Sequence, residues 1–297
     1  MVIYVKSESA EWCDVLRCSQ TAIDLADGDP SKGNFIFGSP LAFAFTTRGM
    51  ARYCLGRPGW RDDLRHGVAM ARSADPMSYA TVVGSVYWSA LPSGVLGPDD
   101  SAVREIEDAL RMAERSGDDV ALALARLTLG FALVHRQTDA ERDRGQELLS
   151  EVSKVFRRGG HNLCDLPIVN VYSARERARR GDRNEAIALM RTAILDLSRE
   201  GQLLGWGVPA TGVLVETLID RGTDNDVAEA EAAIERLAAP PTDESLAGRD
   251  IWLLWLRALL ARAHGDATAY ADFRDRYRDM ARSLGFEGHI AWSEAML

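Results

Sequence analysis

The sequence has few cysteines, no long apolar run and no leader-like start. Its four cysteines, Cys13, Cys18, Cys54 and Cys164, follow no disulfide framework, so we expect reduced thiols and a cytoplasmic location. No stretch reaches the roughly 18 uninterrupted apolar residues of a membrane-spanning helix. The start, MVIYVKSESAEW, has no basic segment followed by a sustained apolar run, so we expect no signal peptide and no membrane partner.

Basic residues are also in the minority. Lys and Arg number 35 against 44 Asp and Glu, which gives a formal net charge of -9. A chain that binds nucleic acid usually presents a basic face, so we expect no direct nucleic-acid partner. The most arginine-rich stretch, residues 175–183, alternates with acidic residues and is typical of a solvated helix surface.

The motifs of common reaction centres are missing too. A phosphate-binding loop needs Gly-x-x-x-x-Gly-Lys-Ser/Thr, and no stretch matches it. His161-x-x-Cys164, followed by Asp165, places two metal-ligand types on one turn. A zinc site takes about four ligands, however, and no second pair has matching spacing. The aspartate pairs at 62–63 and 99–100 lack a further carboxylate on the next turn, so we interpret them as helix caps. We therefore expect no catalytic residue, no cofactor and no metal site.

What the sequence does contain is a repeated turn signal. Successive signals are separated by 41 to 43 residues, which is too regular for chance. They lie at Gly56, Gly97, Asp139, Gly181, Gly222 and Gly265. An amphipathic segment follows each one; after Gly181, apolar residues recur at i, i+3, i+7 and i+10, which is one face of a helix. The segment before each signal is more apolar, such as ALALARLTLGFALV at 121–134.

Start and stop signals agree with helices throughout. Pro76 follows Asp75 at a first helical position, Asp99 and Asp118 supply N-caps, and Pro240-Pro241 marks a connection. Apolar residues never alternate with polar ones long enough to predict a strand. The sequence therefore predicts an all-α protein made of antiparallel helix pairs.

Two kinds of helical repeat have periods near this one. HEAT and armadillo units run about 40–47 residues, whereas a tetratricopeptide unit has about 34. The stretch GDRNEAI at 181–187, with Ala193 after it, matches the tetratricopeptide turn and second helix. Small residues are needed there because the two helices cross closely. We predict a right-handed α-solenoid of tetratricopeptide-like helix pairs with a period of about 42 residues, forming a single domain over residues 1–297.

The two ends of the array carry their own expectations. A helix at about 10–27 resembles a second helix without its first partner, and a capping helix is expected at about 288–297. Terminal repeats need shielding for their apolar faces. We therefore expect either that the chain was separated from an N-terminal domain or that a neighbour, such as a second copy in a homodimer, covers Val15, Leu16 and Ile23.

Three long segments resemble a known family. They are LGRPGWRDDLRHGVAMARSADPMSYATVV, VREIEDALRMAERSGDDVALALARLTLGFALVHR and RYRDMARSLGFEGHIAWSEAM. They are similar to the C-terminal helical-repeat region of large actinobacterial, especially mycobacterial, proteins. Those proteins carry an adenylyl cyclase or a LuxR-type DNA-binding domain together with a signal-transduction ATPase. The resemblance runs from about residue 55 to the C-terminus and carries no active site over.

Aromatic residues on the predicted first helices are candidates for a binding groove. Core packing accounts for each one individually, but as a set they suggest the concave face of a superhelix, where Trp is a frequent binding hot spot. Arginines are candidate anchors for acidic ligand groups. The groove candidates are Trp88, Trp206, Trp252, Trp255, Arg126 and Arg257, with Tyr87, Trp292, Arg48 and Arg52 beside them.

These observations favour a non-catalytic interaction or regulatory module. It would bind a protein segment or effector through the superhelical groove, and the resemblance implies a cyclase, ATPase or transcription-regulator domain as the partner. A stand-alone receptor for peptides or small molecules is the alternative. An uncharacterised helical enzyme is a third and weaker one, because no paired carboxylates, triad or metal constellation stands out.

Overall fold

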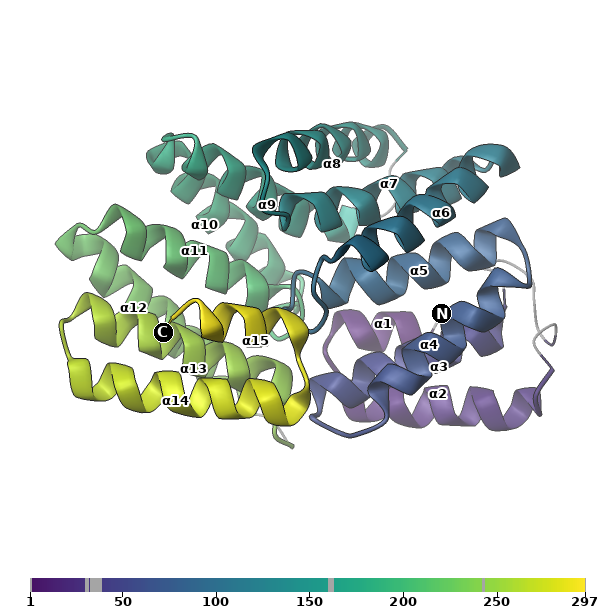
Figure 1. The fold of residues 1–297 in the computed structure, drawn as a ribbon, viewed down its shortest axis with the longest axis horizontal. Helices are drawn as coiled ribbons and strands as arrows, with labels where there is room; N and C mark the ends of the chain where they lie inside the picture. The colour runs from purple at the N-terminus through teal and green to yellow at the C-terminus, as the bar shows by residue number, and fades with distance from the viewer. Residues whose placement is uncertain (1, 30–31, 33–38, 160–162, 242–243, 297) are drawn as a thin grey trace. The chain divides into compact units, whose positions relative to one another are not determined.

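The computed structural model describes residues 2–29, 32, 39–159, 163–241 and 244–296. This part of the chain is all helical, as the sequence predicts (Figure 1). The helices are α1 Val2–Glu8, α2 Trp12–Ala26, α3 Pro40–Cys54, α4 Trp60–Arg72, α5 Pro76–Ala90, α6 Asp100–Ser116, α7 Asp119–Val134, α8 Asp139–Gly159, α9 Leu166–Arg179, α10 Arg183–Arg199, α11 Gly207–Arg221, α12 Asp224–Ala238, α13 Ala247–Ala263, α14 Ala267–Leu284 and α15 Glu287–Glu294. Within the described ranges, no helix is long and apolar enough to cross a membrane.

The chain divides into two compact units. Unit 1 comprises Met1–Ser7 and Glu11–Gly159, and unit 2 comprises Glu8–Ala10 and Gly160–Leu297. The sequence predicts one domain over residues 1–297, and whether both units belong to one continuous array stays a prediction.

Unit 1 is built from consecutive helix pairs, each of which packs on the next. The pairs are α3 with α4, α5 with α6, and α7 with α8. The first helix of each pair also packs on the first helix of the next pair, so that α3 contacts α5 and α5 contacts α7. The second helices α4 and α6 pack on the first helix that follows them. We call α3, α5 and α7 the first helices of unit 1.

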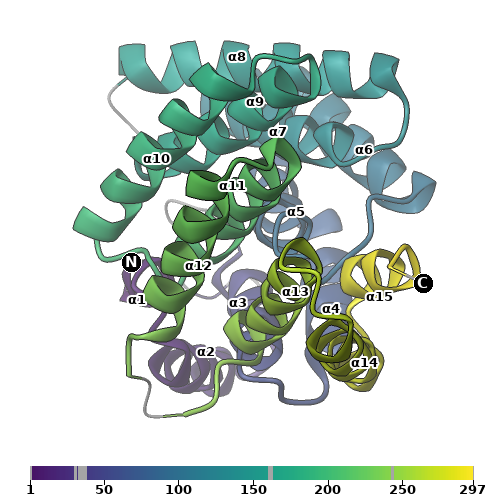
Figure 2. The same ribbon diagram turned by 90° about the vertical axis from the view of Figure 1, so that its left-hand side faces the viewer.

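Unit 2 repeats this scheme. Its pairs are α9 with α10, α11 with α12, and α13 with α14 (Figure 2). The first helices α9, α11 and α13 pack in succession, and the second helices α10 and α12 each pack on the next first helix. Each unit is therefore an ordered row of helix pairs.

The six turn signals lie at the turns within the pairs. Gly56, Gly97, Gly181, Gly222 and Gly265 fall between the first and second helix of a pair, and Asp139 is the first residue of α8. Gly181 has a φ of 103° and Gly222 a φ of 74°, a left-handed conformation in which a Cβ would be strained. This geometry explains why glycine marks these turns in the sequence.

The predicted N-terminal helix is present as α2. It packs on α3, the first helix that follows it, and the Ser19 and Thr47 hydroxyls are hydrogen-bonded at 2.8 Å in a buried contact. Val15 is fully buried, whereas Leu16 and Ile23 keep partial exposure. Packing on the following first helix is also what α4 and α6 do, so the absence of a first-helix partner for α2 stays a prediction.

Glycines allow the close crossings that the small-residue pattern predicts. A Cβ on Gly145 of α8 would lie 2.8 Å from the Val134 backbone nitrogen of α7. A Cβ on Gly67 of α4 would lie 2.4 Å from the Thr46 hydroxyl of α3. Both distances are too short for a side chain, so the two helices of these pairs approach backbone to backbone.

Candidate functional site

The first helices are largely buried, and few of their residues keep partial exposure. We call those between the first and last turns of a first helix its stripe residues. In unit 2, they are Asn170, Ser173, Arg175, Glu216, Leu254 and Arg257. In unit 1, they are Phe45, Arg48, Thr81, Ser85, Leu124 and Arg126. Ser173 and Arg175, like Leu124 and Arg126, are two positions apart and therefore lie roughly 200° apart around their helix. The stripe residues of α7 and α9 thus do not all share one face.

Arg126 and Arg257, two of the predicted groove residues, are among these stripe residues. Among the described residues, no hydrogen bond or ion pair holds the Arg126 guanidinium. Arg257 approaches Glu235 no closer than 4.0 Å. Arg175 is equally far from Glu216 on the neighbouring helix, also at 4.0 Å. These cations are available to an acidic group because their protein partners hold them only weakly.

Arg48 and Arg52 do not serve as free anchors. Both nitrogens of the Arg48 fork bind Asp63, at 2.6 and 2.9 Å, and Arg52 binds the same carboxylate at 2.7 Å. Asp63 is buried, so it ties α4 to α3 rather than capping a helix as the sequence suggested. Asp99 does cap α6, because its carboxylate accepts the Ala102 amide at 2.7 Å.

The four predicted tryptophans are core residues. Trp252 is 2% exposed and Trp88, Trp206 and Trp255 are each 9% exposed. A buried indole offers no contact area to a partner, so these side chains cannot anchor a ligand in this conformation of the protein. Residue type alone could not reveal this, because Trp serves both cores and hot spots.

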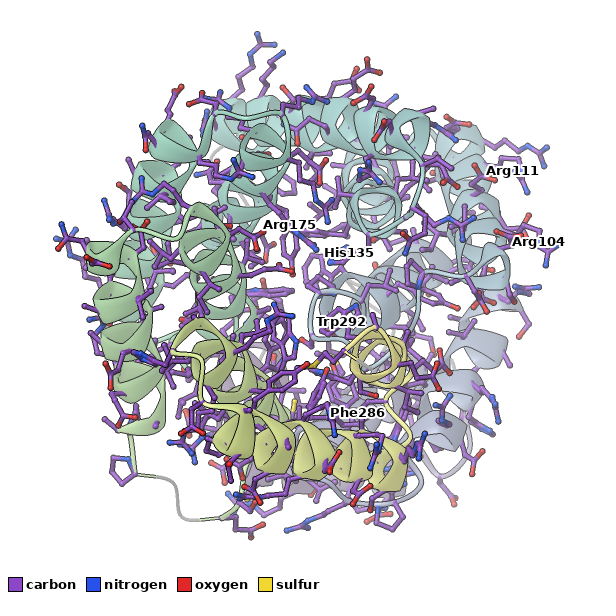
Figure 3. All side chains as sticks on the ribbon, turned by 60° about the vertical axis from the view of Figure 1, so that its left-hand side comes forward. Arg104, Arg111, His135, Arg175, Phe286 and Trp292 are labelled. Atoms are coloured by element: carbon purple, nitrogen blue, oxygen red, sulfur yellow. The ribbon has the colours of Figure 1, made fainter. Side chains whose placement is uncertain are left out.

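Instead, the aromatic residues of the last three helices join into one cluster. The rings of Trp252 and Trp255 on α13 lie 5.5 and 5.6 Å from that of Trp292 on α15. His289 is fully buried beside them, and the Tyr277 hydroxyl lies 2.8 Å from His289 Nδ1. Trp292 is labelled in Figure 3. The cluster joins α13 to α15, the last helix of unit 2.

Figure 3 shows the side chains of Arg104 and Arg111 on the second helix α6 and of Arg175 on the first helix α9. Arg104 and Arg111 point away from α6 and are exposed. Arg175 projects from α9 and has Glu216 of the adjacent α11 as its nearest acidic partner. Arg104 and Arg111 are thus exposed, whereas Arg175 is partly buried.

A second polar group in unit 2 is unlike the others because it is buried and acidic. Asp165, at the start of α9, is 1% exposed, and neither of its carboxyl oxygens has a hydrogen-bond partner of ordinary geometry. Gln202, before α11, is 4% exposed and donates its amide NH₂ to Glu8 at 2.7 Å. The amide oxygen of Gln202 has no partner either.

Burial governs the electrostatics of this group. It raises the pKa of Glu8 to about 7, with a smaller contribution from the Glu200 charge. Burial also raises the pKa of Asp165 well above its ordinary value, and the nearby Glu8 charge adds to the rise, whereas the Trp206 side chain opposes it. Both carboxyls therefore resist ionisation unless positive charge reaches them.

The sequence pointed to this region for a different reason. His161-x-x-Cys164 and Asp165 were considered as metal ligands and set aside. His161 lies outside the described residues, Cys164 is partly exposed, and Asp165 is buried. Glu8 and Gln202 gave no sequence signal because they are 194 residues apart. Within the described ranges, no three His, Cys, Asp or Glu side chains gather as metal ligands.

Comparison with known proteins assigns no family. No family model matches the chain. No curated protein matches it significantly. The resemblance to the actinobacterial helical-repeat region therefore stays a prediction.

Proposed function

We propose that the chain is a non-catalytic interaction module, a tetratricopeptide-like α-solenoid whose first helices bind a protein segment. The observation that carries the proposal is the set of partly exposed stripe residues on otherwise buried first helices. In a right-handed solenoid the first helices line the concave face, so the stripe residues that face it would form the binding surface. The order of packing within each unit and the position of the six turns support this architecture.

The stripe residues define the chemistry of the bound segment. In unit 2, Arg175 and Arg257 carry positive charge and Glu216 carries negative charge. The apolar Leu254 lies three residues before Arg257 on α13. The weak 4.0 Å pairs with Glu216 and Glu235 leave both guanidiniums able to take a better carboxylate. The fitting partner is an acidic segment with an apolar residue, and the resemblance favours a cyclase, ATPase or regulator domain as its source.

The decisive experiment measures capture by the full chain. Purified cyclase and ATPase domains of the resembling family and a set of short acidic peptides are titrated by calorimetry. Arg257→Glu and Arg175→Glu are expected to weaken binding roughly thirtyfold, which corresponds to about 2 kcal/mol. Arg104→Glu is the matched control, because it reverses an equally large cation on the outer surface of α6 and is expected to leave binding unchanged.

The outcomes separate the alternatives. Binding of a folded domain that depends on the stripe arginines supports the module, whereas binding of free peptides or small molecules alone supports a stand-alone receptor. Equal losses from Arg104→Glu and Arg257→Glu would mean that net charge, rather than the stripe residues, governs association, and the proposal would be wrong.

A further inference from the structure

The buried polar group of unit 2 has a surplus of hydrogen-bond acceptors. Asp165 contributes two unpartnered oxygens and Gln202 contributes one, and each of these atoms exposes less than 1 Å² to solvent. Native proteins pair nearly all such atoms, because an acceptor withdrawn from water without a donor is costly. A second carboxyl, that of Glu8, is hydrogen-bonded to Gln202, and its charge acts on the Asp165 carboxyl.

The orientation of Gln202 follows from its hydrogen bond with the ionised form of Glu8. Its amide nitrogen lies 2.7 Å from a Glu8 oxygen, and a carboxylate can only accept a hydrogen bond. Turning the amide over would place oxygen against oxygen. The Gln202 carbonyl oxygen therefore adds a third unpartnered acceptor to the two of Asp165.

This set of atoms suits one class of ligand. Carboxylate and amide oxygens are the ligands that hard cations such as Ca²⁺ and Mg²⁺ take in proteins. The near-zero accessibility of the three oxygens favours a compact ion over a bulkier organic amine. An ion would neutralise the two buried carboxyls and satisfy the unpartnered acceptors together.

We propose that Asp165, Gln202 and Glu8 form a binding site for a small hard cation in unit 2. Asp165 supplies both oxygens, Gln202 its carbonyl oxygen and Glu8 a carboxylate oxygen. The remaining ligands are water or backbone carbonyls, as is usual for Mg²⁺. The site is separate from the stripe residues of the first helices and stands whether or not those bind a partner.

Terbium luminescence tests the site directly. Tb³⁺ is a Ca²⁺ substitute whose emission is sensitised by a nearby indole, and the Trp206 side chain lies close enough to Asp165 to affect its carboxyl. Excitation of the full-length protein at indole wavelengths is expected to give saturable emission with one ion per chain. Competition with Ca²⁺ and with Mg²⁺ then ranks the two ions.

Three variants make the test specific. Asp165→Asn is expected to lower the affinity for Ca²⁺ by roughly 100-fold and Gln202→Leu by roughly tenfold, the range known for ligands and their supports. Trp206→Phe is expected to remove most of the sensitised emission but to leave Ca²⁺ binding in calorimetry unchanged. Asp62→Asn is the matched control because Asp62 is an exposed carboxylate in unit 1.

Folding of the variants does not obscure the result. Asp165→Asn replaces a buried carboxyl that lacks a hydrogen-bond partner with a neutral amide of the same shape, so its ion-free melting temperature is expected to equal or exceed that of the unmodified protein. The unmodified protein and the exposed-site control should then gain more melting temperature than Asp165→Asn does on adding Ca²⁺. The proposal is overturned if none of the three ions binds saturably, or if Asp165→Asn binds them as tightly as Asp62→Asn does.

Discussion

Trp252 packs so closely on Gly212 that a Cβ on residue 212 would lie 2.0 Å from the indole ring. The contact joins α13 to α11, two consecutive first helices of unit 2. Because residue 212 has no side chain, the Trp252 indole lies directly on the backbone of α11. The ring of Trp255 then stands at 77° to that of Trp252, with 5.2 Å between their centroids.

Gly212→Ala is expected to destabilise the protein by about 1–3 kcal/mol, because the added methyl group collides with a ring that cannot move freely in its cluster. Thermal unfolding followed by circular dichroism measures the effect. Gly84→Ala is the control, since its Cβ would meet Thr128 at 3.4 Å and alanine is the better helix former. An equal loss in both variants would show that the indole is not the obstacle.

Ala186→Trp is expected to cost roughly 1–3 kcal/mol or more, because Ala186 is fully buried at the start of α10. Ala188→Trp places the same ring on the same helix at an exposed position and is expected to change the unfolding midpoint little. Urea unfolding of both variants measures the difference. Similar midpoints would mean that α10 can rotate to accommodate the ring.

The ion pair between Asp226 and Arg221 is expected to make the junction between α11 and α12 sensitive to acid. Asp226 accepts hydrogen bonds from Arg221 at 2.9 Å and from the Thr223 backbone at 3.1 Å, and these bonds, with Arg221 first, lower the pKa of Asp226. Because the folded-state pKa lies below the ordinary 3.8, this stabilisation is complete above about pH 4 and is lost as the pH falls further. Asp226→Asn should cost about 1–2 kcal/mol at pH 7 and flatten the acid limb of the stability profile.

Asp224→Asn provides the comparison for that profile. Asp224 lies on the same helix in the exposed first turn, so its loss removes a similar charge without the buried pair. Between pH 7 and 2.5, the difference in unfolding free energy between the unmodified protein and Asp226→Asn should narrow towards the acid end. A constant difference across this range would exclude the pair as the cause.

Trp292→Ala is expected to loosen the C-terminal end of unit 2 by about 2–3 kcal/mol, because Trp292 closes the ring cluster over Trp252 and Trp255. Amide hydrogen exchange should speed up in α14 and α15 first. Trp292→Phe keeps an aromatic ring and should retain most of the protection. Uniform acceleration over the whole chain would instead indicate a global loss.

The all-helical fold and the six turns could be predicted because their causes are local. Glycine with a positive φ at Gly181 or Gly222 marks a turn whatever surrounds it. The buried hydrogen bond between Ser19 of α2 and Thr47 of α3 could not be predicted, since it joins residues of two different helices.

The site residues divide in the same way. Arg126 and Arg257 occupy partly exposed positions, which the helical period of their neighbours indicates. The burial of Trp206 and Trp252 depends on which helix packs against each indole. A single sequence does not reveal which helices are in contact. The Asp165 group was missed because its members meet only after the chain has folded back on itself.

The bond between Glu8 and Gln202 can form only late in synthesis. The two residues are separated by 194 positions, so the ribosome must synthesise all of the intervening chain before Glu8 can accept a hydrogen bond from the Gln202 amide. Closing such a loop carries an entropy cost that shorter contacts avoid. A fragment that begins after residue 10 would lack Glu8 altogether, and its Gln202 amide would have to find another acceptor or water. Truncation at the N-terminal end is thus expected to destabilise the structure first around residue 202, although that residue is far from the cut in the sequence.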